Sequence, residues 1–399
     1  MTWLIPREEL SVSQLKAVEA AWDTHKIIMG APGSGKTQVL MHRAAYMVEQ
    51  LGLNDDDYHI FVYTRLLKDY LKADIFLLNL SEANVSTFDA WCKNYHVNNI
   101  SGHLPKIGKN LDFKEMRKRV LKHVKQHLDK FPIYRFVMVD EGQDLDQVAY
   151  KILKIIAEHI TVCLDYQQQI YEEKCEPDEI VRILQTSRKN RILLEAFRCS
   201  PYVAELAATL LSEEKRQPYL AQVRIPQRER LTPLLYYANS REEESRRMIE
   251  IIRTRMDAGD QIAVLFPRNK MLYGYAQAMQ EAHIEVETMA NIDIHSNRPK
   301  FVNYYSVKGL TFDTILMPRL VDWAFSNISD ERTKQLLFVG ISRARRWVYL
   351  STDENLPLKT LESLTACDHL TIQRPEDLLP DSTSEGAQRT IEDDLLDLL

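Results

Sequence analysis

The sequence has 399 residues, 45% hydrophobic and 27% charged, which suffices for two or three globular domains and excludes wholesale disorder. Its 12 glycines and 15 prolines exclude a collagen-like or low-complexity chain, and no apolar stretch reaches the ~20 residues of a membrane-spanning helix. The net charge of -6 is concentrated at the C-terminal end, because residues 371–399 contain eight Asp or Glu against two Arg.

Short apolar runs alternate with helical patterns along the chain. The predicted strands, in chain order, are 26–29, 60–64, 84–87, 136–140, 160–165, 192–195, 234–238, 262–266, 302–305, 314–317 and 347–351. Several of these runs lack period-two alternation, as expected of strands that are buried on both faces of a parallel sheet. Helical patterns lie between them, for example at 12–22 and 38–50. The alternation predicts an α/β fold built from βαβ units with parallel sheets.

The predicted strands separate into two sets, so we expect an N-terminal lobe, 1–190, and a C-terminal lobe, 191–370. A flexible acidic tail, 371–399, is expected to follow, and the leucines at its end suggest a peptide that docks on a protein partner. The alternative is a tail that packs back on its own body.

Residues 96–132 are expected to form a small basic helical insertion in the first lobe. Nine Lys or Arg against three Asp or Glu lie between 106 and 130. Asp112 is the expected N-cap of its helix, and the apolar stripe of that helix is expected to pack in the core. The basic face suits nucleic acid or a protein partner, with a solvated face as the alternative. Its cations are Lys114, Arg117, Lys118, Lys122 and Lys125.

The five cysteines are odd in number and show no CxxC spacing, which argues against a disulfide framework or a zinc module and favours a reducing compartment. The N-terminal segment becomes charged before an apolar signal-peptide core could form. We therefore expect a cytoplasmic protein with no membrane partner.

A GxxxxGK[ST] motif follows the first predicted strand and precedes a helical pattern. Its glycines allow backbone N–H groups to turn toward phosphate oxygens, and the helix N-terminus adds its dipole. Lys36 is expected to contact the outer phosphates and Thr37 to bind Mg²⁺, so ATP and Mg²⁺ are the expected cofactors. The residues predicted to bind ATP here are Gly30, Ala31, Pro32, Gly33, Ser34, Gly35, Lys36, Thr37 and Gln38.

Two acids follow the apolar run at 136–139. A buried parallel strand delivers its C-terminal residues to the ligand-binding edge of the sheet. Asp140 is therefore predicted to hold Mg²⁺ and Glu141 to activate the attacking water. A pair of surface acids is the alternative when these residues are considered alone.

The segment 140–144, DEGQD, resembles the DExQD box of superfamily one DNA helicases of the UvrD/Rep type. Other segments resemble that family's motifs and follow one another in the family's order, across roughly residues 10–352. They are 10–14, 62–65, 86–88, 165–171, 196–200, 306–313 and 338–345. The resemblance implies two RecA-like P-loop NTPase lobes with parallel sheets. It also implies ATP bound between the lobes and single-stranded or partly duplex DNA as the partner.

The resemblance implies roles for further residues of the nucleotide site. Gln14 would hydrogen-bond adenine, Phe197 would stack on it and Gln168 would sense the γ-phosphate. Arg198 and Arg343 would act as arginine fingers from the second lobe. Considered alone, Phe197 would be a core residue and each arginine a member of a surface ion pair.

The resemblance also implies a track for single-stranded DNA, lined by Tyr63, Thr64, Thr87 and Phe88. Simple strand packing is the alternative for these side chains. Gly309 lies in the segment that resembles motif V, and we expect it beside ATP.

The sequence departs from the family pattern in several places. Thr311 stands where the family has a ribose-binding Glu, and Tyr305 replaces the usual His. Residues 172–174, EEK, stand where the family usually has an aromatic residue that stacks on a base. The two insertions that the family carries are also reduced to about 40 residues after Tyr95 and about 30 after Phe266.

Three functions remain open at this point. The preferred one is an ATP-dependent DNA helicase or translocase that moves 3′ to 5′. The second is a DNA-stimulated regulatory ATPase that controls a partner such as a nuclease without separating strands. The third, a small-molecule kinase, fits poorly with two arginine-bearing motifs in a second lobe.

Overall fold

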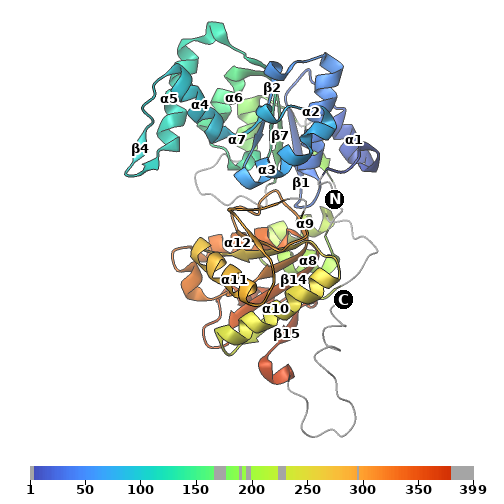
Figure 1. Ribbon diagram of the computed structural model, residues 1–399. Helices are drawn as coiled ribbons and strands as arrows, with labels where there is room; N and C mark the ends of the chain where they lie inside the picture. Colours follow the sequence, from blue (N-terminus) through green and yellow to red (C-terminus); the bar gives the residue numbers. More distant parts are fainter. Residues whose placement is uncertain are drawn as a thin grey trace. The chain divides into compact units, whose positions relative to one another are not determined.

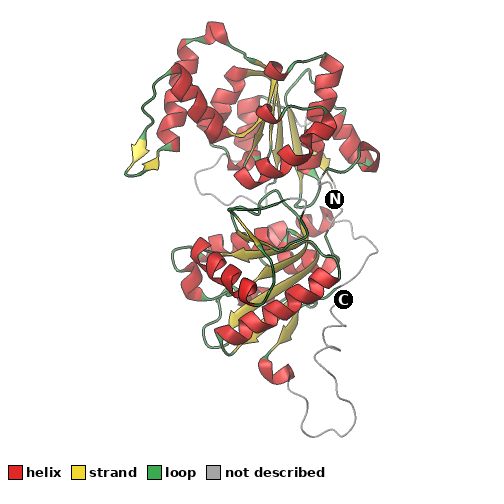
Figure 2. Cartoon of the chain, viewed as in Figure 1, coloured by secondary structure: helices red, strands yellow, loops and turns green. Residues whose placement is uncertain are grey.

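The computed structural model describes residues 4–165, 177–187, 191–194, 199–222, 231–293 and 296–378. The chain folds as two compact units, Met1–Glu195 and Ala196–Leu399, and each is described by itself (Figure 1). The boundary between the units lies between Glu195 and Ala196, whereas the sequence led us to expect it at 190/191. Each unit is an α/β layered structure with helices on both faces of a parallel sheet (Figure 2).

The first unit contains a six-stranded parallel sheet with the order β3-β2-β6-β7-β1-β8. Its strands are β1 Lys26–Gly30, β2 Tyr58–Val62, β3 Val85–Thr87, β6 Tyr134–Val139, β7 Ala157–Leu164 and β8 Arg191–Leu194. Strand β7 lies between β1, which leads into the GxxxxGK[ST] loop, and β6, which ends before the acidic pair. All five residues of β2 are buried, as expected of a central parallel strand.

Helices α4 to α7 pack on one face of this sheet and share a hydrophobic core with it. Their bounds are α4 Phe88–Asn99, α5 Phe113–Gln126, α6 Gln147–Ile156 and α7 Pro177–Leu184. The remaining helices of the unit are α1 Val12–Val18, α2 Lys36–Leu51 and α3 Arg65–Asp74. Short 3-10 turns lie at Arg7–Glu9, Asp55–Asp57, Ile75–Leu78, Glu82–Asn84, Leu128–Lys130 and Gly142–Asp144.

The expected basic insertion consists of the end of α4, a two-stranded hairpin and α5. The hairpin pairs β4 Lys106–Ile107 with β5 Asn110–Leu111 in antiparallel register. Asp112 caps α5 as expected, because its side chain accepts a hydrogen bond from the Glu115 N–H at 2.9 Å.

The second unit contains a seven-stranded parallel sheet with the order β11-β12-β10-β13-β14-β9-β15. Its strands are β9 Leu234–Ala238, β10 Ile262–Phe266, β11 Glu287–Thr288, β12 Lys300–Asn303, β13 Phe312–Met317, β14 Ala344–Asp353 and β15 Thr371–Gln373. The helices are α8 Pro201–Ala208, α9 Glu213–Gln222, α10 Arg241–Asp257, α11 Asn269–Glu281, α12 Asp330–Ile341 and α13 Leu361–Leu364. Further 3-10 turns lie at Asp322–Phe325 and Pro375–Leu378. Helices α10 and α11 share the core on one face of this sheet.

The expected tail begins with regular structure. Thr371–Gln373 pairs in parallel with β9 as the last strand of the sheet, and Arg374 reaches Glu354 at 3.2 Å. Three residues were too short a run for the apolar pattern to indicate a strand. Residues 379–399, with the terminal leucines, lie outside the described residues. Among the residues that are described, no helix is both long and apolar enough to span a membrane.

Candidate functional site

The GxxxxGK[ST] loop connects β1 directly to the N-terminus of α2. Gly35 is the N-cap of this helix in the left-handed conformation, with φ of 79°, and provides no side-chain cap for the first N–H groups. A Cβ at Gly30 would lie 2.3 Å from Ser34 Oγ, so the loop needs glycine here. Ser34 Oγ is buried and has no hydrogen-bond partner within the described part of the chain. The helix terminus and this hydroxyl suit a phosphate-bearing ligand.

The Lys36 side chain lies inside this loop. Its Nζ donates hydrogen bonds to the carbonyl oxygens of Gly30 at 2.8 Å and Ala31 at 3.1 Å. It also forms an ion pair with Asp165 Oδ2 at 3.2 Å, and the side chains of both partners are at least nine-tenths buried. A bound phosphate would compete with this carboxylate for the same ammonium group.

Thr37 meets the acidic pair at the end of β6. Its Oγ1 donates a hydrogen bond to Asp140 Oδ2 at 2.7 Å. Burial raises the pKa of Asp140 to about 6, with a further increase from the charge of Glu141, while Thr37 and Lys36 act in the opposite direction. A hydroxyl beside a carboxylate is a suitable donor set for Mg²⁺, which commonly takes one or two protein ligands and completes its shell with water and phosphate. The described residues contain no cluster of three His, Cys, Asp or Glu that could hold a metal alone.

Glu141 is held by a residue to which the sequence gave no role. Its backbone is left-handed, with φ of 51°, and its carboxylate is buried. Gln143 Nε2 donates to Glu141 Oε2, and Gln143 Oε1 accepts from the Asp165 N–H at 3.0 Å. Gln143 therefore links Glu141 to the residue that pairs with Lys36. The signal for Gln143 was its place within the DEGQD segment, and Asp165 showed as the end of an apolar run and the first residue of the motif-like segment 165–171, with no role assigned to it.

Two further predicted ATP ligands are already engaged within the first unit. Gln14 completes the capping box of α1 and donates through Nε2 to the Ser34 carbonyl of the loop at 2.9 Å. Gln38 Oε1 accepts from the Ile5 N–H at 3.2 Å. Gln14 thus fixes the loop, while Gln38 fixes the N-terminal segment.

In the second unit, Arg343 is buried rather than at the surface. Its guanidinium donates to the carbonyl oxygens of Val339 at 3.2 Å and Leu310 at 3.5 Å, which joins the two motif-like segments 306–313 and 338–345. Gly309 precedes Leu310 and is left-handed, with φ of 83°. Gln168, Phe197 and Arg198 lie outside the described residues.

The residues predicted to contact DNA meet at the carboxyl ends of β2 and β3. Tyr63, Thr87 and Phe88 line a cavity of about 350 Å³. Thr64 and Thr87 cap α3 and α4 by accepting hydrogen bonds from Leu67 N and Ala90 N. Phe88 is 3% exposed and packs against Phe61 at a ring distance of 5.3 Å, so most of its ring belongs to the core.

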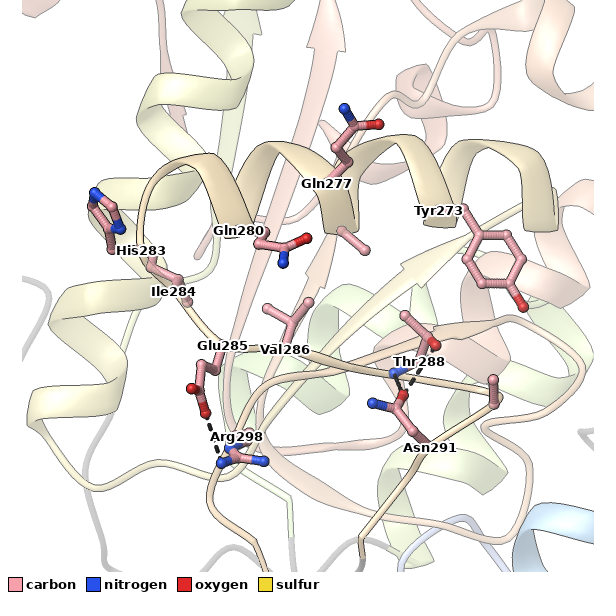
Figure 3. A pocket seen from close by; sticks show the side chains of 12 residues that line it. Tyr273, Gln277, Gln280, His283, Ile284, Glu285, Val286, Thr288, Asn291 and Arg298 are labelled. Carbon is pink, nitrogen blue, oxygen red and sulfur yellow. Dashed lines mark hydrogen bonds and ion pairs between the residues drawn. The ribbon is translucent and has the colours of Figure 1, made fainter.

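A larger groove, of about 1050 Å³, lies in the second unit between α11 and the segment that carries β11 (Figure 3). The sequence gave no indication of it. Tyr273 flanks one end, and Arg298 forms an ion pair with Glu285 at 2.6 Å. Because Arg298 is neutralised in this way, the groove offers no strong charge to select a ligand.

Comparisons with known protein families and with individual proteins show what this chain is similar to. The sequence profile of a family described as "AAA domain" matches residues 14–174. A "Probable DNA helicase" of Mycoplasma pneumoniae is 26% identical over 235 residues, which cover 54% of this chain and 43% of that protein. A "Putative ATP-dependent DNA helicase R568" of Acanthamoeba polyphaga mimivirus is 22% identical over 382 residues, covering 86% of this chain and 54% of that protein. The chain thus spans about half the length of these curated relatives.

Among solved structures, the C-terminal domain of a possible DNA helicase from Lactobacillus plantarum covers 44% of this chain and 98% of its own. Its identity is 16% and its TM-score of 0.35 is too low to carry an argument. The profile and the two curated relatives support a helicase-like P-loop ATPase family. The fold agrees with them, because both units are α/β with the large parallel sheets of RecA-like P-loop domains.

Proposed function

We propose that this chain is an ATP-dependent DNA helicase or translocase that hydrolyses ATP and moves on single-stranded DNA from 3′ to 5′. One observation carries the proposal: Lys36, Thr37, Asp140 and Glu141 converge at one edge of the first sheet. This is the set of groups that phosphoryl transfer to water requires. The similarity to two DNA helicases supports DNA as the track.

Each residue of the site in the first unit has a separate role. Lys36 and the first N–H groups of α2 bind the phosphates, so the ion pair with Asp165 must open when ATP enters. Thr37 and Asp140 hold Mg²⁺, which when bound neutralises charge on the phosphate oxygens. Glu141 orients the attacking water and accepts its proton, while Gln143 fixes the Glu141 carboxylate.

The remaining assignments complete the proposed mechanism. Gln14 and Phe197 bind adenine, and Gly309 lies beside the nucleotide. Gln168 senses the γ-phosphate. Arg198 and Arg343 neutralise charge that develops on the transferred group, so hydrolysis requires the two lobes to close. For Arg343 this means leaving its two carbonyl partners within the second unit.

An ATPase assay with and without single-stranded DNA, followed by a strand-displacement assay, tests the proposal. We expect the rate of ATP turnover to rise when single-stranded DNA is added. We also expect the motor to load on a strand with a 3′ overhang and to displace the strand annealed to it. ATP hydrolysis that is indifferent to both DNA and RNA, or phosphate transfer to a small acceptor, would contradict it. If RNA and not DNA stimulated ATP turnover, the proposed substrate would change to RNA, but the proposal of an ATP-driven motor would stand.

A regulatory ATPase without strand separation is the second candidate. It is favoured by the reduced first insertion, which in the structure is the end of α4, a hairpin and α5. This candidate would be selected if DNA stimulated ATP turnover, the chain alone displaced no strand, and a co-purified protein gained an activity under control of that turnover.

A further inference from the structure

The apolar stripe of α5 extends past the core that it fills. Met116, Val120 and Val124 on this stripe are fully buried. Phe113 lies on the same stripe, three residues before Met116, yet it is 40% exposed. Its ring lines the 350 Å³ cavity at the carboxyl ends of β2, β3 and β6, so an apolar ring is presented to an open space.

The residues that line this cavity differ in chemistry. Tyr63 and Thr87, at the ends of β2 and β3, line it together with Phe113, and the volume suits a small organic ligand. Asp89, Asp144 and Arg117 also line the cavity, and Asp89 forms an ion pair with Arg117. The two carboxylates can accept hydrogen bonds from N–H groups of a neutral ring, whereas the cation in the lining is already paired and offers little to a phosphate.

Arg117, the cation of α5 that lines this cavity, is held in place by two acids. It contacts Asp89 at 2.7 Å and Asp146 at 2.8 Å, and its guanidinium lies 6.0 Å from the centre of the Phe88 ring. This corrects the expectation that Arg117 presents a free charge to a polyanion, because its charge is already balanced. Lys118 and Lys122 on the same helix are exposed, and at about 100° per residue they lie on the side of α5 away from Phe113.

We propose, on the premise of the function proposed above, that this cavity takes one unpaired nucleobase of a single strand, stacked on Phe113. Base stacking on an aromatic ring is tolerant of sequence, as a motor requires. Phe113 thereby supplies the stacking surface that residues 172–174, EEK, do not provide.

The base pocket also adjoins the nucleotide site. Asp140 lines the cavity and at the same time accepts the hydrogen bond from Thr37. A base in the pocket therefore contacts the same β6 end that carries the Mg²⁺-binding carboxylate. This contact provides a direct physical link between strand binding and the site of hydrolysis.

Fluorescence anisotropy with the full-length chain and a labelled oligothymidylate of about 16 nucleotides tests the pocket. Phe113→Ala should weaken binding by about 5- to 150-fold, whereas Phe113→Trp should retain affinity. The salt dependence should stay unchanged in Phe113→Ala, because the ring makes no phosphate contact. Phe76→Ala, which removes a 62% exposed ring from another part of the first unit, is the matched control and should bind normally.

The possible outcomes distinguish a failure of the base pocket from a failure of the proposed helicase or translocase function. An oligonucleotide of equal length with abasic sites should bind weakly and lose its sensitivity to Phe113→Ala. The same series with oligouridylate decides between DNA and RNA as the source of the base. The pocket proposal is wrong, while the proposed motor stands, if the wild type binds single strands and Phe113→Ala binds them equally well. The same conclusion follows if Phe76→Ala loses as much affinity as Phe113→Ala. If the wild type binds no single strand, both proposals fail.

Discussion

The Lys36–Asp165 pair predicts that a substitution of the phosphate-loop lysine acts on stability as well as on turnover. Side-chain exposure is 7% for Lys36 and 1% for Asp165. Removing one member of such a buried pair leaves the other charge uncompensated, at a cost of about 3–5 kcal/mol. For a unit of this size, each 1 kcal/mol lowers the melting temperature by about 2–4 °C. Lys36→Met should therefore abolish ATP turnover and lower the melting temperature of the first unit by about 6–20 °C.

The double variant Lys36→Met/Asp165→Leu separates the two effects. Replacing both charges with apolar side chains of similar size should be about neutral for stability. We therefore expect the double variant to melt within about 4 °C of the wild type while remaining inactive, since only the catalytic loss persists. Asp23→Asn is the matched control, because Asp23 pairs with Lys26 at 3.4 Å but is 75% exposed, so this variant should melt like the wild type.

Differential scanning calorimetry and a steady-state phosphate-release assay measure both quantities. The reasoning would be refuted if Lys36→Met melted like the wild type, or if the double variant were as unstable as the single one. Wild-type turnover in Lys36→Met would instead overturn the nucleotide site as a whole.

Two other substitutions and one truncation give sharp expectations. Glu141→Gln should still bind ATP, measured with a fluorescent analogue, but lose about 10²–10⁴-fold in hydrolysis, because it removes the general base; lost binding would make Glu141 structural. Arg343→Lys should bind nucleotide within a few-fold of wild type and hydrolyse it about 10³–10⁵-fold more slowly; equal losses in Kd and kcat would indicate a packing role through the Val339 and Leu310 carbonyl groups. Removing residues 379–399 should leave the melting temperature and ATP turnover unchanged, as expected of a partner-docking peptide; a lower melting temperature would show that the tail packs on its own body.

The sequence by itself predicted the phosphate loop and the acidic pair, because each consists of residues that are consecutive in the chain. A phosphate loop needs its glycines, Lys36 and Thr37 at fixed spacing, and a strand that ends in Asp140 and Glu141 needs only a short apolar run before them. The α/β class followed in the same way from local runs and their alternation. The Asp112 cap was likewise visible, because an N-cap and its partner N–H are only three residues apart.

Only the tertiary structure decided which distant residues meet. The sheet order places β7 between β1 and β6, which brings Asp165 to Lys36 across 129 positions and to Gln143 across 22. Strand order depends on how helices and crossovers pack, and no local pattern encodes it. The same packing buries most of the Phe88 ring in the core, where the sequence predicted a contact with nucleic acid, and leaves Phe113 exposed at the end of a stripe where the pattern predicted core. Apolar periodicity fixes which face of a helix turns inward, but the extent of the neighbouring elements determines where along that face the core ends.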